Sequence, residues 1–245
     1  MNYWSDAQDL LRAHGEMESA GVRQRLIERH KRIVDPNKDC FEGKTVLDLA
    51  SHNGRWTYAA IKAGTSYILG IEGRQELIDT GLAEFARFPR ESYDFARGDV
   101  YDMSAIAEGY RRTQFDTILC LGLYYHVADH YLLFRKMRSL NPSNIIIDTP
   151  LIKSDVPSIR YGIEESADKS NAIAEHQDVA MAMRGIASQG FIKLAAQLSG
   201  YSVSYVPWKA RDCEFPDSVA DYFDSSNDVR RMTVVLRALP DKPIW

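Results

Sequence analysis

Residues 45–54 read TVLDLASHNG, an apolar run that ends in an acid, a small-residue turn and a glycine. A helical pattern follows at once, from Arg55 to Ala63, and Gly64 ends it in the manner of many helices. A short β-branched run followed directly by a helix is typical of a βαβ unit. This stretch therefore predicts an α/β fold built on a parallel sheet.

The same alternation continues toward the C-terminus. We expect helices at Arg55–Ala63, Gln75–Phe88, Met103–Tyr110, Asp129–Leu140 and Ser188–Leu198. We expect strands at Thr45–Leu49, Tyr67–Ile71, Tyr93–Arg97, Phe115–Leu121, Asn144–Thr149, Ser202–Val206 and Thr233–Leu239. The stretch 150–187 is long for a connection, which is typical of a functional insertion. Within it, residues 160–163 are a candidate lid, and Met181 and Met183 are expected in the core.

The composition is that of an ordinary globular protein. The 245 residues are 45% hydrophobic and 26% charged, which excludes a disordered chain, a collagen-like repeat and a disulfide-stapled miniprotein. Three widely spaced cysteines, no apolar run near the roughly 20 residues that span a bilayer, and a charged N-terminus predict a cytoplasmic protein without a membrane anchor. The net charge of −4 and the pI of about 5.9 argue against nucleic acid as a partner.

Acidic residues close the next two predicted strands. Glu72 ends the second strand, and Asp99 follows the third. In an open parallel sheet, ligands bind beyond the carboxyl ends of the strands. A carboxylate at Glu72 can accept both hydroxyls of a ribose, and one at Asp99 can accept the amine of an adenine. The pattern predicts a nucleoside ligand.

A dinucleotide does not fit the first turn. Pyrophosphate binding requires a glycine-rich turn that lets the backbone approach the phosphates. The turn from Leu49 to Gly54 contains a single glycine. A nucleoside ligand without phosphates is the better interpretation.

These residues resemble the class I S-adenosylmethionine-dependent methyltransferases over about residues 44–149. In that family the first motif is an acid followed by three alternating glycines, and residues 46–54 occupy the same frame with Ala50 and His52 in place of two of them. The resemblance implies an α/β fold with a seven-stranded, mostly parallel, doubly wound sheet in the order 3-2-1-4-5-7-6. It divides the chain into an N-terminal helical cap (1–38) and a methyltransferase domain (39–245) with a long insertion at about 150–187.

The resemblance also assigns roles to single positions. Asp48 and the turn 50–54 hold the aminoacyl end of S-adenosylmethionine, Glu72 holds the ribose, and Asp99 with the backbone of Val100 holds the adenine. The full set of candidate cofactor residues is Asp48, Ala50, Ser51, His52, Asn53, Gly54, Glu72, Gly73, Asp99, Val100 and Leu121. The reaction product would be S-adenosylhomocysteine.

Two candidate catalytic residues follow the fourth and fifth strands. If the acceptor is a hydroxyl, a base must take its proton, and histidine is the usual choice near neutral pH. His126 lies in the loop after the fourth strand, and Asp148 closes the fifth. His126 is also compatible with a structural role, hydrogen-bonded to a loop carbonyl.

Residues 115–133 are similar to the tRNA wobble-uridine carboxymethyltransferases and to many small-molecule methyltransferases. The dense basic stretch at 23–32 keeps a tRNA acceptor open, whereas the acidic pI favours a small molecule. A divalent metal bound by His126, Asp148, His176 and Asp178 is possible on residue types but is not predicted by their spacing.

The sequence as a whole predicts an S-adenosylmethionine-dependent methyltransferase (EC 2.1.1.-) that acts on a small molecule, more readily at oxygen than at nitrogen. Two alternatives stay open. One is a tRNA-modifying (carboxy)methyltransferase, and the other is a non-catalytic cofactor-binding protein, suggested by the two replaced glycines. No motif indicates the oligomeric state.

Overall fold

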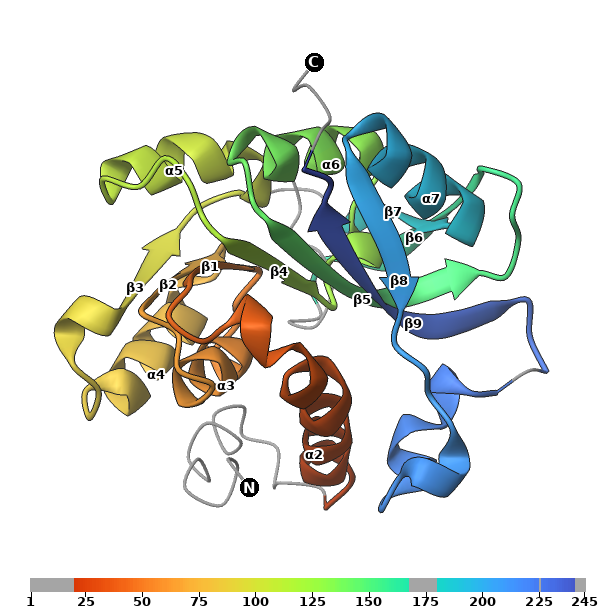
Figure 1. The fold of residues 1–245 in the computed structure, drawn as a ribbon, viewed down its shortest axis with the longest axis horizontal. Helices are drawn as coiled ribbons and strands as arrows, with labels where there is room; N and C mark the ends of the chain where they lie inside the picture. The colour runs from red at the N-terminus through yellow and green to blue at the C-terminus, as the bar shows by residue number, and fades with distance from the viewer. Residues whose placement is uncertain (1–19, 168–179, 225, 241–245) are drawn as a thin grey trace.

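A seven-stranded sheet forms the centre of the chain in a computed structural model, which describes residues 20–167, 180–224 and 226–240 (Figure 1). Its strand order is β3-β2-β1-β4-β5-β9-β8. The strands are β1 (Thr45–Leu49), β2 (Tyr67–Glu72), β3 (Tyr93–Arg97), β4 (Thr117–Leu121), β5 (Asn144–Ile152), β8 (Tyr201–Tyr205) and β9 (Val229–Ala238). Strands β1 to β5 pair in parallel, and β9 runs antiparallel to both β5 and β8. The predicted α/β class and strand order are confirmed, because β8 and β9 are the sixth and seventh strands of this sheet.

Helices cover both faces of the sheet (Figure 1). One face carries α2 (Ala20–Ile33), α3 (Arg55–Lys62) and α4 (Gln75–Phe85), and the other carries α5 (Met103–Gly109), α6 (His130–Ser139) and α7 (Gln189–Leu198). Short 3-10 turns connect these elements: η1 (Asp35–Cys40), η2 (Arg90–Ser92), η3 (Val100–Asp102), η4 (Tyr124–His126), η5 (Ala210–Asp212) and η6 (Pro216–Tyr222). Each of the five predicted helices is present within a few residues of its expected ends.

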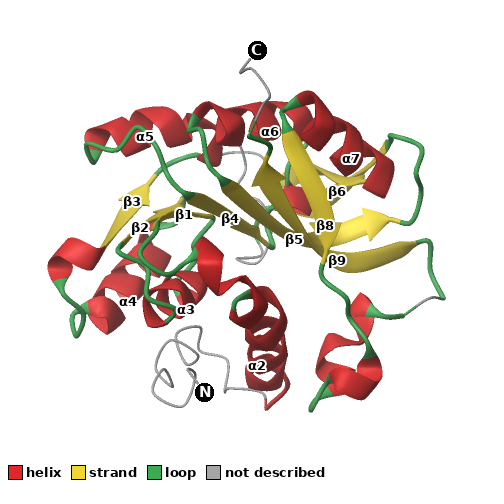
Figure 2. Cartoon of the chain, viewed as in Figure 1, coloured by secondary structure: helices red, strands yellow, loops and turns green. Residues whose placement is uncertain are grey.

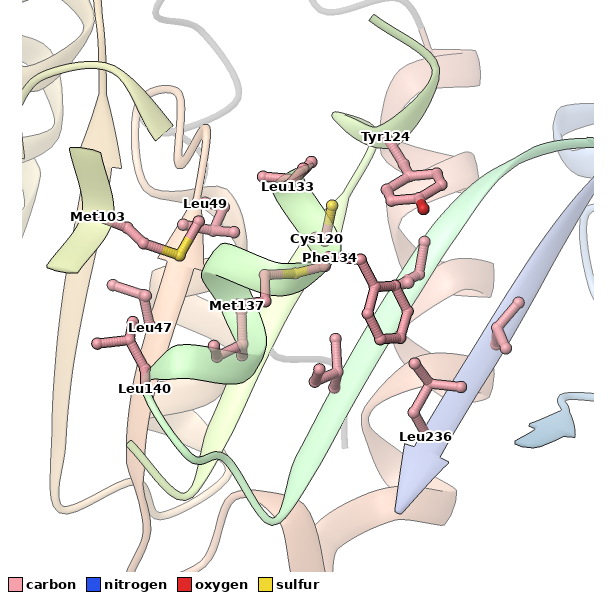
Figure 3. Close-up of a cluster of buried hydrophobic side chains, with 14 of the residues drawn as sticks. Leu47, Leu49, Met103, Cys120, Tyr124, Leu133, Phe134, Met137, Leu140 and Leu236 are labelled. Atoms are coloured by element: carbon pink, nitrogen blue, oxygen red, sulfur yellow. The ribbon is translucent and has the colours of Figure 1, made fainter. Parts of the chain in front are cut away.

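Alternation along β1 divides the apolar side chains between two cores. Val46 packs into the core under α2, α3 and α4, whereas Leu47 and Leu49 pack into the core under α5, α6 and α7. Figure 3 shows part of the second core, where Leu133, Phe134 and Met137 of α6 meet the strands. A strand buried on both faces reads as a continuous apolar run, which is why TVLDL predicts its place so well.

The long insertion contains a second, two-stranded sheet, whose strand β7 contacts β5 of the central sheet (Figure 2). Strands β6 (Ile159–Glu165) and β7 (Met181–Ala187) pair antiparallel, and the residues between them lie outside the described part of the chain from 168 to 179. The prediction that Met181 and Met183 are core residues is wrong. Both lie on the outward side of β7, and their side chains are 40% and 57% exposed.

No helix in the described ranges is long and apolar enough to cross a membrane. Because β1, β2, β3 and β4 are parallel, their carboxyl ends lie along a single edge of the sheet. The turn 50–54, Glu72, Asp99 and η4 lie at that edge. The topology alone therefore places most of the candidate residues close together.

Candidate active site

The turn after β1 keeps the backbone path that glycine normally provides. Ala50 and His52 have φ of 52° and 56°, and Gly54 has φ of 86°. These left-handed values fall at the three positions where the related motif has glycine, although a non-glycine residue rarely adopts them. At Gly54 a side chain is excluded as well, since a Cβ atom would lie 2.7 Å from Phe95 and 2.8 Å from Phe85. The backbone is therefore left-handed at all three positions in spite of the two replacements.

Glu72 connects the end of β2 to this turn. Its side chain is buried, and Oε2 accepts a hydrogen bond of 3.0 Å from the backbone N–H of His52. Oε1 accepts another of 3.0 Å from the backbone N–H of Arg74. A carboxylate oxygen can accept two hydrogen bonds, so each one can also accept a ligand hydroxyl. This geometry fits the ribose role that the sequence suggested.

Asp48 lies beneath the turn, fully buried. Its Oδ2 accepts a hydrogen bond of 2.7 Å from Oγ1 of Thr57 in α3. Burial raises the pKa of Asp48 to about 7, and the negative charge of Glu72 acts in the same direction, while the bond from Thr57 opposes the shift. The carboxyl group consequently titrates near neutral pH and ties β1 to the first helical turn of α3.

The remaining candidate cofactor residues follow the next strands. Asp99 is exposed after β3 and accepts a hydrogen bond of 2.8 Å from the backbone N–H of Tyr101, which starts η3 at Val100. Leu121 is the last residue of β4 and is buried. Ser51, Asn53 and Gly73 lie in the turns after β1 and β2. All eleven candidates thus lie at or beside the carboxyl ends of β1 to β4.

His126 lies in η4, directly after β4, and is paired with a carboxylate. Its Nδ1 is 2.8 Å from Oε1 and 2.9 Å from Oε2 of Glu164 in β6, and both side chains are buried. An Nδ1–H that donates to a carboxylate leaves Nε2 as the basic nitrogen. Burial lowers the pKa of His126, and the charges of Arg184 and Arg231 lower it further, while Glu164 opposes the shift. Burial and the two arginines thus favour the neutral form of the imidazole.

The sequence did not reveal Glu164. It lies 38 residues from His126, beside Glu165 and directly after the candidate lid at 160–163. Strand alternation from Ile159 onward is a weak signal that Glu164 and Glu165 face opposite ways. Choosing between the two carboxylates required the packing of the β6–β7 sheet against η4.

Asp148 is fully buried at the centre of an ionic cluster. Arg29 donates to it at 3.0 Å and Arg231 at 2.8 Å. The hydroxyls of Tyr222 and Thr233 also donate to it, each at 2.7 Å to Oδ2. Burial disfavours the charge of Asp148, but the two arginines, helped by the two hydroxyls, outweigh it and lower its pKa. The carboxylate stays ionised and joins α2, β5, η6 and β9.

The basic stretch 23–32 forms α2 and faces the segment 212–221. Arg25 makes a two-pronged ion pair with Asp221, with distances of 2.7 and 2.8 Å. Lys31 pairs with Glu214 at 2.6 Å, and Arg32 donates to the backbone carbonyl of Asp212. Most of the positive charge that kept a tRNA acceptor open is therefore balanced within the chain.

The four residues considered for a metal are not brought together by the described structure. His176 and Asp178 lie outside the described residues, while Asp148 is surrounded by arginines and His126 by Glu164. Within the described ranges, no group of three or more histidine, cysteine, aspartate or glutamate side chains is placed to bind a metal ion.

Comparison with known proteins finds low-identity relatives. No protein-family model matches the chain. A tRNA U34 carboxymethyltransferase of Campylobacter hominis is 26% identical over 127 residues, which are 50% of this chain and 41% of that protein. The tRNA U34 carboxymethyltransferase of Alteromonas mediterranea is 22% identical over 140 residues, which are 56% of this chain and 42% of that protein. The matched region spans about two fifths of these curated relatives.

Solved structures match over nearly the whole length. The N-terminal domain of EvdMO1, crystallised in the presence of SAH and D-fucose, superposes with a TM-score of 0.65 at 19% identity, covering 96% of this chain and 95% of that one. The Burkholderia thailandensis 1,6-didemethyltoxoflavin-N1-methyltransferase, with 1,6-didemethyltoxoflavin and S-adenosylhomocysteine bound, has a TM-score of 0.56 at 12% identity, covering 96% of this chain and 88% of that one. The resemblance seen in the sequence is confirmed: the chain has the fold of the class I S-adenosylmethionine-dependent methyltransferases.

Proposed function

We propose that this protein is an S-adenosylmethionine-dependent methyltransferase that methylates a hydroxyl of a small molecule, with His126 as the general base. The observation that carries the proposal is the buried pair of His126 and Glu164 at the carboxyl end of β4, on the same edge as the turn 50–54. The pair holds a neutral imidazole with Nε2 available to accept a proton.

The residues at the ends of β1 to β3 fit the cofactor. Glu72 accepts the ribose hydroxyls, the exposed carboxylate of Asp99 accepts the adenine amine, and the turn 50–54 receives the aminoacyl end. Asp48 supports this turn through Thr57. These assignments rest on the preserved left-handed path of the turn and on the positions of the two carboxylates.

S-adenosylmethionine supplies a methyl group on a sulfonium that leaves as a neutral thioether. His126 would accept the hydroxyl proton at Nε2 as the acceptor oxygen takes the methyl group. Glu164 orients the ring and stabilises the imidazolium that forms. Asp148 acts indirectly in this scheme: it fixes Arg29 and Arg231 and with them the packing of α2 against the edge.

A tRNA acceptor is the second candidate, favoured by the names of the curated relatives. The internal ion pairs of Arg25, Arg29 and Lys31 argue against it, because the charges of these cations are already balanced. RNA binding that weakens steeply with salt would favour this candidate.

Calorimetric titration with S-adenosylmethionine and S-adenosylhomocysteine, with NAD as the negative control, tests the proposal. We expect both adenosyl compounds to bind and NAD not to bind. Glu72→Ala should weaken binding roughly ten- to hundredfold, because a hydrogen bond to a charged group contributes about 1.5–3 kcal/mol. Glu91→Ala, an exposed carboxylate on η2, is the matched control and should bind like the wild type.

Absence of binding in a folded wild-type protein would refute the proposed class. Binding would be followed by a turnover screen of hydroxylated small molecules with and without Mg²⁺, beside bulk tRNA at several salt concentrations. Cofactor binding without methylation of any acceptor would instead favour the non-catalytic alternative.

A further inference from the structure

Arg184 lies on the side of the β6–β7 sheet that faces His126. It is the direct cross-strand partner of Gly162, and Glu164 stands two residues further along the same strand. Side chains at positions 162 and 164 share one face of a strand, so Arg184 and Glu164 lie on the same face of this sheet. The carboxylate of Glu164 reaches His126 from this face. Arg184 therefore stands beside the candidate base.

Within the part of the chain that the structure describes, Arg184 has no acidic partner, unlike Arg25, Arg29 and Arg231. Arg25, Arg29 and Arg231 are paired with Asp221 or Asp148. Within the described ranges, Arg184 makes no ion pair or hydrogen bond, although its side chain is half-buried. A partly desolvated guanidinium without a partner is unfavourable, and a carboxylate or phosphate group matches its planar donors.

The neighbourhood leaves this guanidinium accessible. Its cross-strand neighbour Gly162 has no side chain, and a Cβ atom there would lie 3.8 Å from Nε of Arg184, at ordinary contact distance. Gly162 is itself exposed. The positive charge of Arg184 lowers the pKa of His126. An anion at Arg184 would consequently lie within one small molecule's length of the imidazole.

We propose that Arg184 is a specificity-determining residue that binds an anionic group, a carboxylate or a phosphate, on the small acceptor whose hydroxyl faces His126. The inference rests on the proposed function and narrows the acceptor to hydroxylated anions. The two ends of such a molecule are held by different strands of the edge: the hydroxyl by His126 after β4, and the anionic group by Arg184 on β7.

The experiment uses benzoate and inorganic phosphate as separate probes, followed through the ring resonances of His126 by NMR. In the wild type, we expect a saturable shift and a higher His126 pKa with the probe that matches the natural anionic group, because the bound charge offsets that of Arg184. Arg184→Gln should weaken this response at least about tenfold, and Arg184→Lys should restore part of it. Arg160→Gln on β6, an exposed arginine paired with Asp228, is the control and should respond like the wild type.

A response to benzoate alone assigns a carboxylate, and a response to phosphate alone assigns a phosphate. An equal response in Arg184→Gln, or no response to either probe in the wild type, would overturn the inference. Binding seen only with tRNA would overturn it too, in favour of a nucleic-acid acceptor. Titration of the wild type with S-adenosylmethionine distinguishes a failure of this inference from a failure of the proposed function. Cofactor binding without an anion response refutes the role of Arg184 alone, whereas absence of cofactor binding in the folded wild type refutes the proposed function.

Discussion

The edge of the sheet has two halves that are built in different ways. In the β1–β3 half, formed by the turn 50–54, Glu72 and Asp99, each residue follows its own strand in chain order. In the β4–β9 half, formed by His126, Glu164 and the Asp148 cluster, the partners come from six elements between α2 and β9. Arg29 and Asp148 are 119 residues apart.

This difference shows which site residues a local sequence pattern can predict. Parallel pairing brings the ends of consecutive strands to one edge automatically, so the β1–β3 half follows from strand positions alone. The β4–β9 half depends on which of many charged residues meet after long-range packing. A change in the β4–β9 half should therefore break a network, whereas a change in the β1–β3 half should act locally.

The largest effect is expected for Asp148→Asn. This variant leaves the largely buried Arg29 without a counter-charge and leaves Arg231 paired only with the partly exposed Asp221. Breaking a buried ion pair in this way costs about 3–5 kcal/mol of unfolding free energy. Urea denaturation measures the loss. Asp228→Asn removes an exposed carboxylate that pairs with Arg160, and it should leave stability nearly unchanged. Equal effects of the two variants would mean that the cluster does not hold the β4–β9 half together.

Next in size is the loss of activity in His126→Ala. Turnover should fall by about 10² or more, the usual scale for a general base, with cofactor affinity retained. Because burial lowers the pKa of His126, wild-type turnover should persist as the pH falls through 6.5 and decline only below it. The control is His130→Gln, since both ring nitrogens of His130 lie near backbone carbonyls and serve the fold. Unchanged turnover in His126→Ala would remove this residue from the mechanism.

A smaller effect, seen through pH, is expected for Asp48→Asn. The pKa of Asp48 is about 7 in the folded chain and about 3.9 when unfolded, so between these values only the folded state binds the proton. This stabilising contribution is complete below pH 4 and is lost as the pH rises through 7. The free energy of unfolding of the variant, relative to that of the wild type, should therefore rise by about 1.4 kcal/mol per pH unit between pH 5 and 7. Thermal unfolding at several pH values measures it, and exposed Asp79→Asn should track the wild type.

The smallest expected effect is an increase in stability. Ala50→Gly removes the cost of a left-handed alanine and should stabilise the protein by about 0.5–1 kcal/mol. Ala105→Gly, in the exposed interior of α5, should instead destabilise it by a similar amount. Cofactor affinity should not change in Ala50→Gly, because the turn already has its shape. A large gain in affinity would show that the alanine side chain obstructs the site.

The strands show where sequence patterns succeed. The predicted ends of β1 and β3 match the structure, and those of β2 differ by one residue, since buried strands between clear turn residues leave little freedom. The β6–β7 sheet shows where they fail. Its strands carry exposed apolar residues such as Ile163 and Met183, so their pattern resembles neither a core strand nor an amphipathic helix.

The sequence by itself determined the fold class and the position of the residues in the β1–β3 half, because apolar periodicity and parallel topology are properties of the chain in order. The order of the sheet followed from the resemblance to a known family. The sequence also marked His126. Only the tertiary structure decided that Glu164 is its partner and that Asp148 is enclosed by Arg29 and Arg231. It also decided that most of the positive charge of α2 is balanced internally and that Arg184 has no ion pair among the described residues. Ion pairs between separate elements depend on the distances between side chains and on their burial in the folded chain, and the local sequence predicts neither quantity.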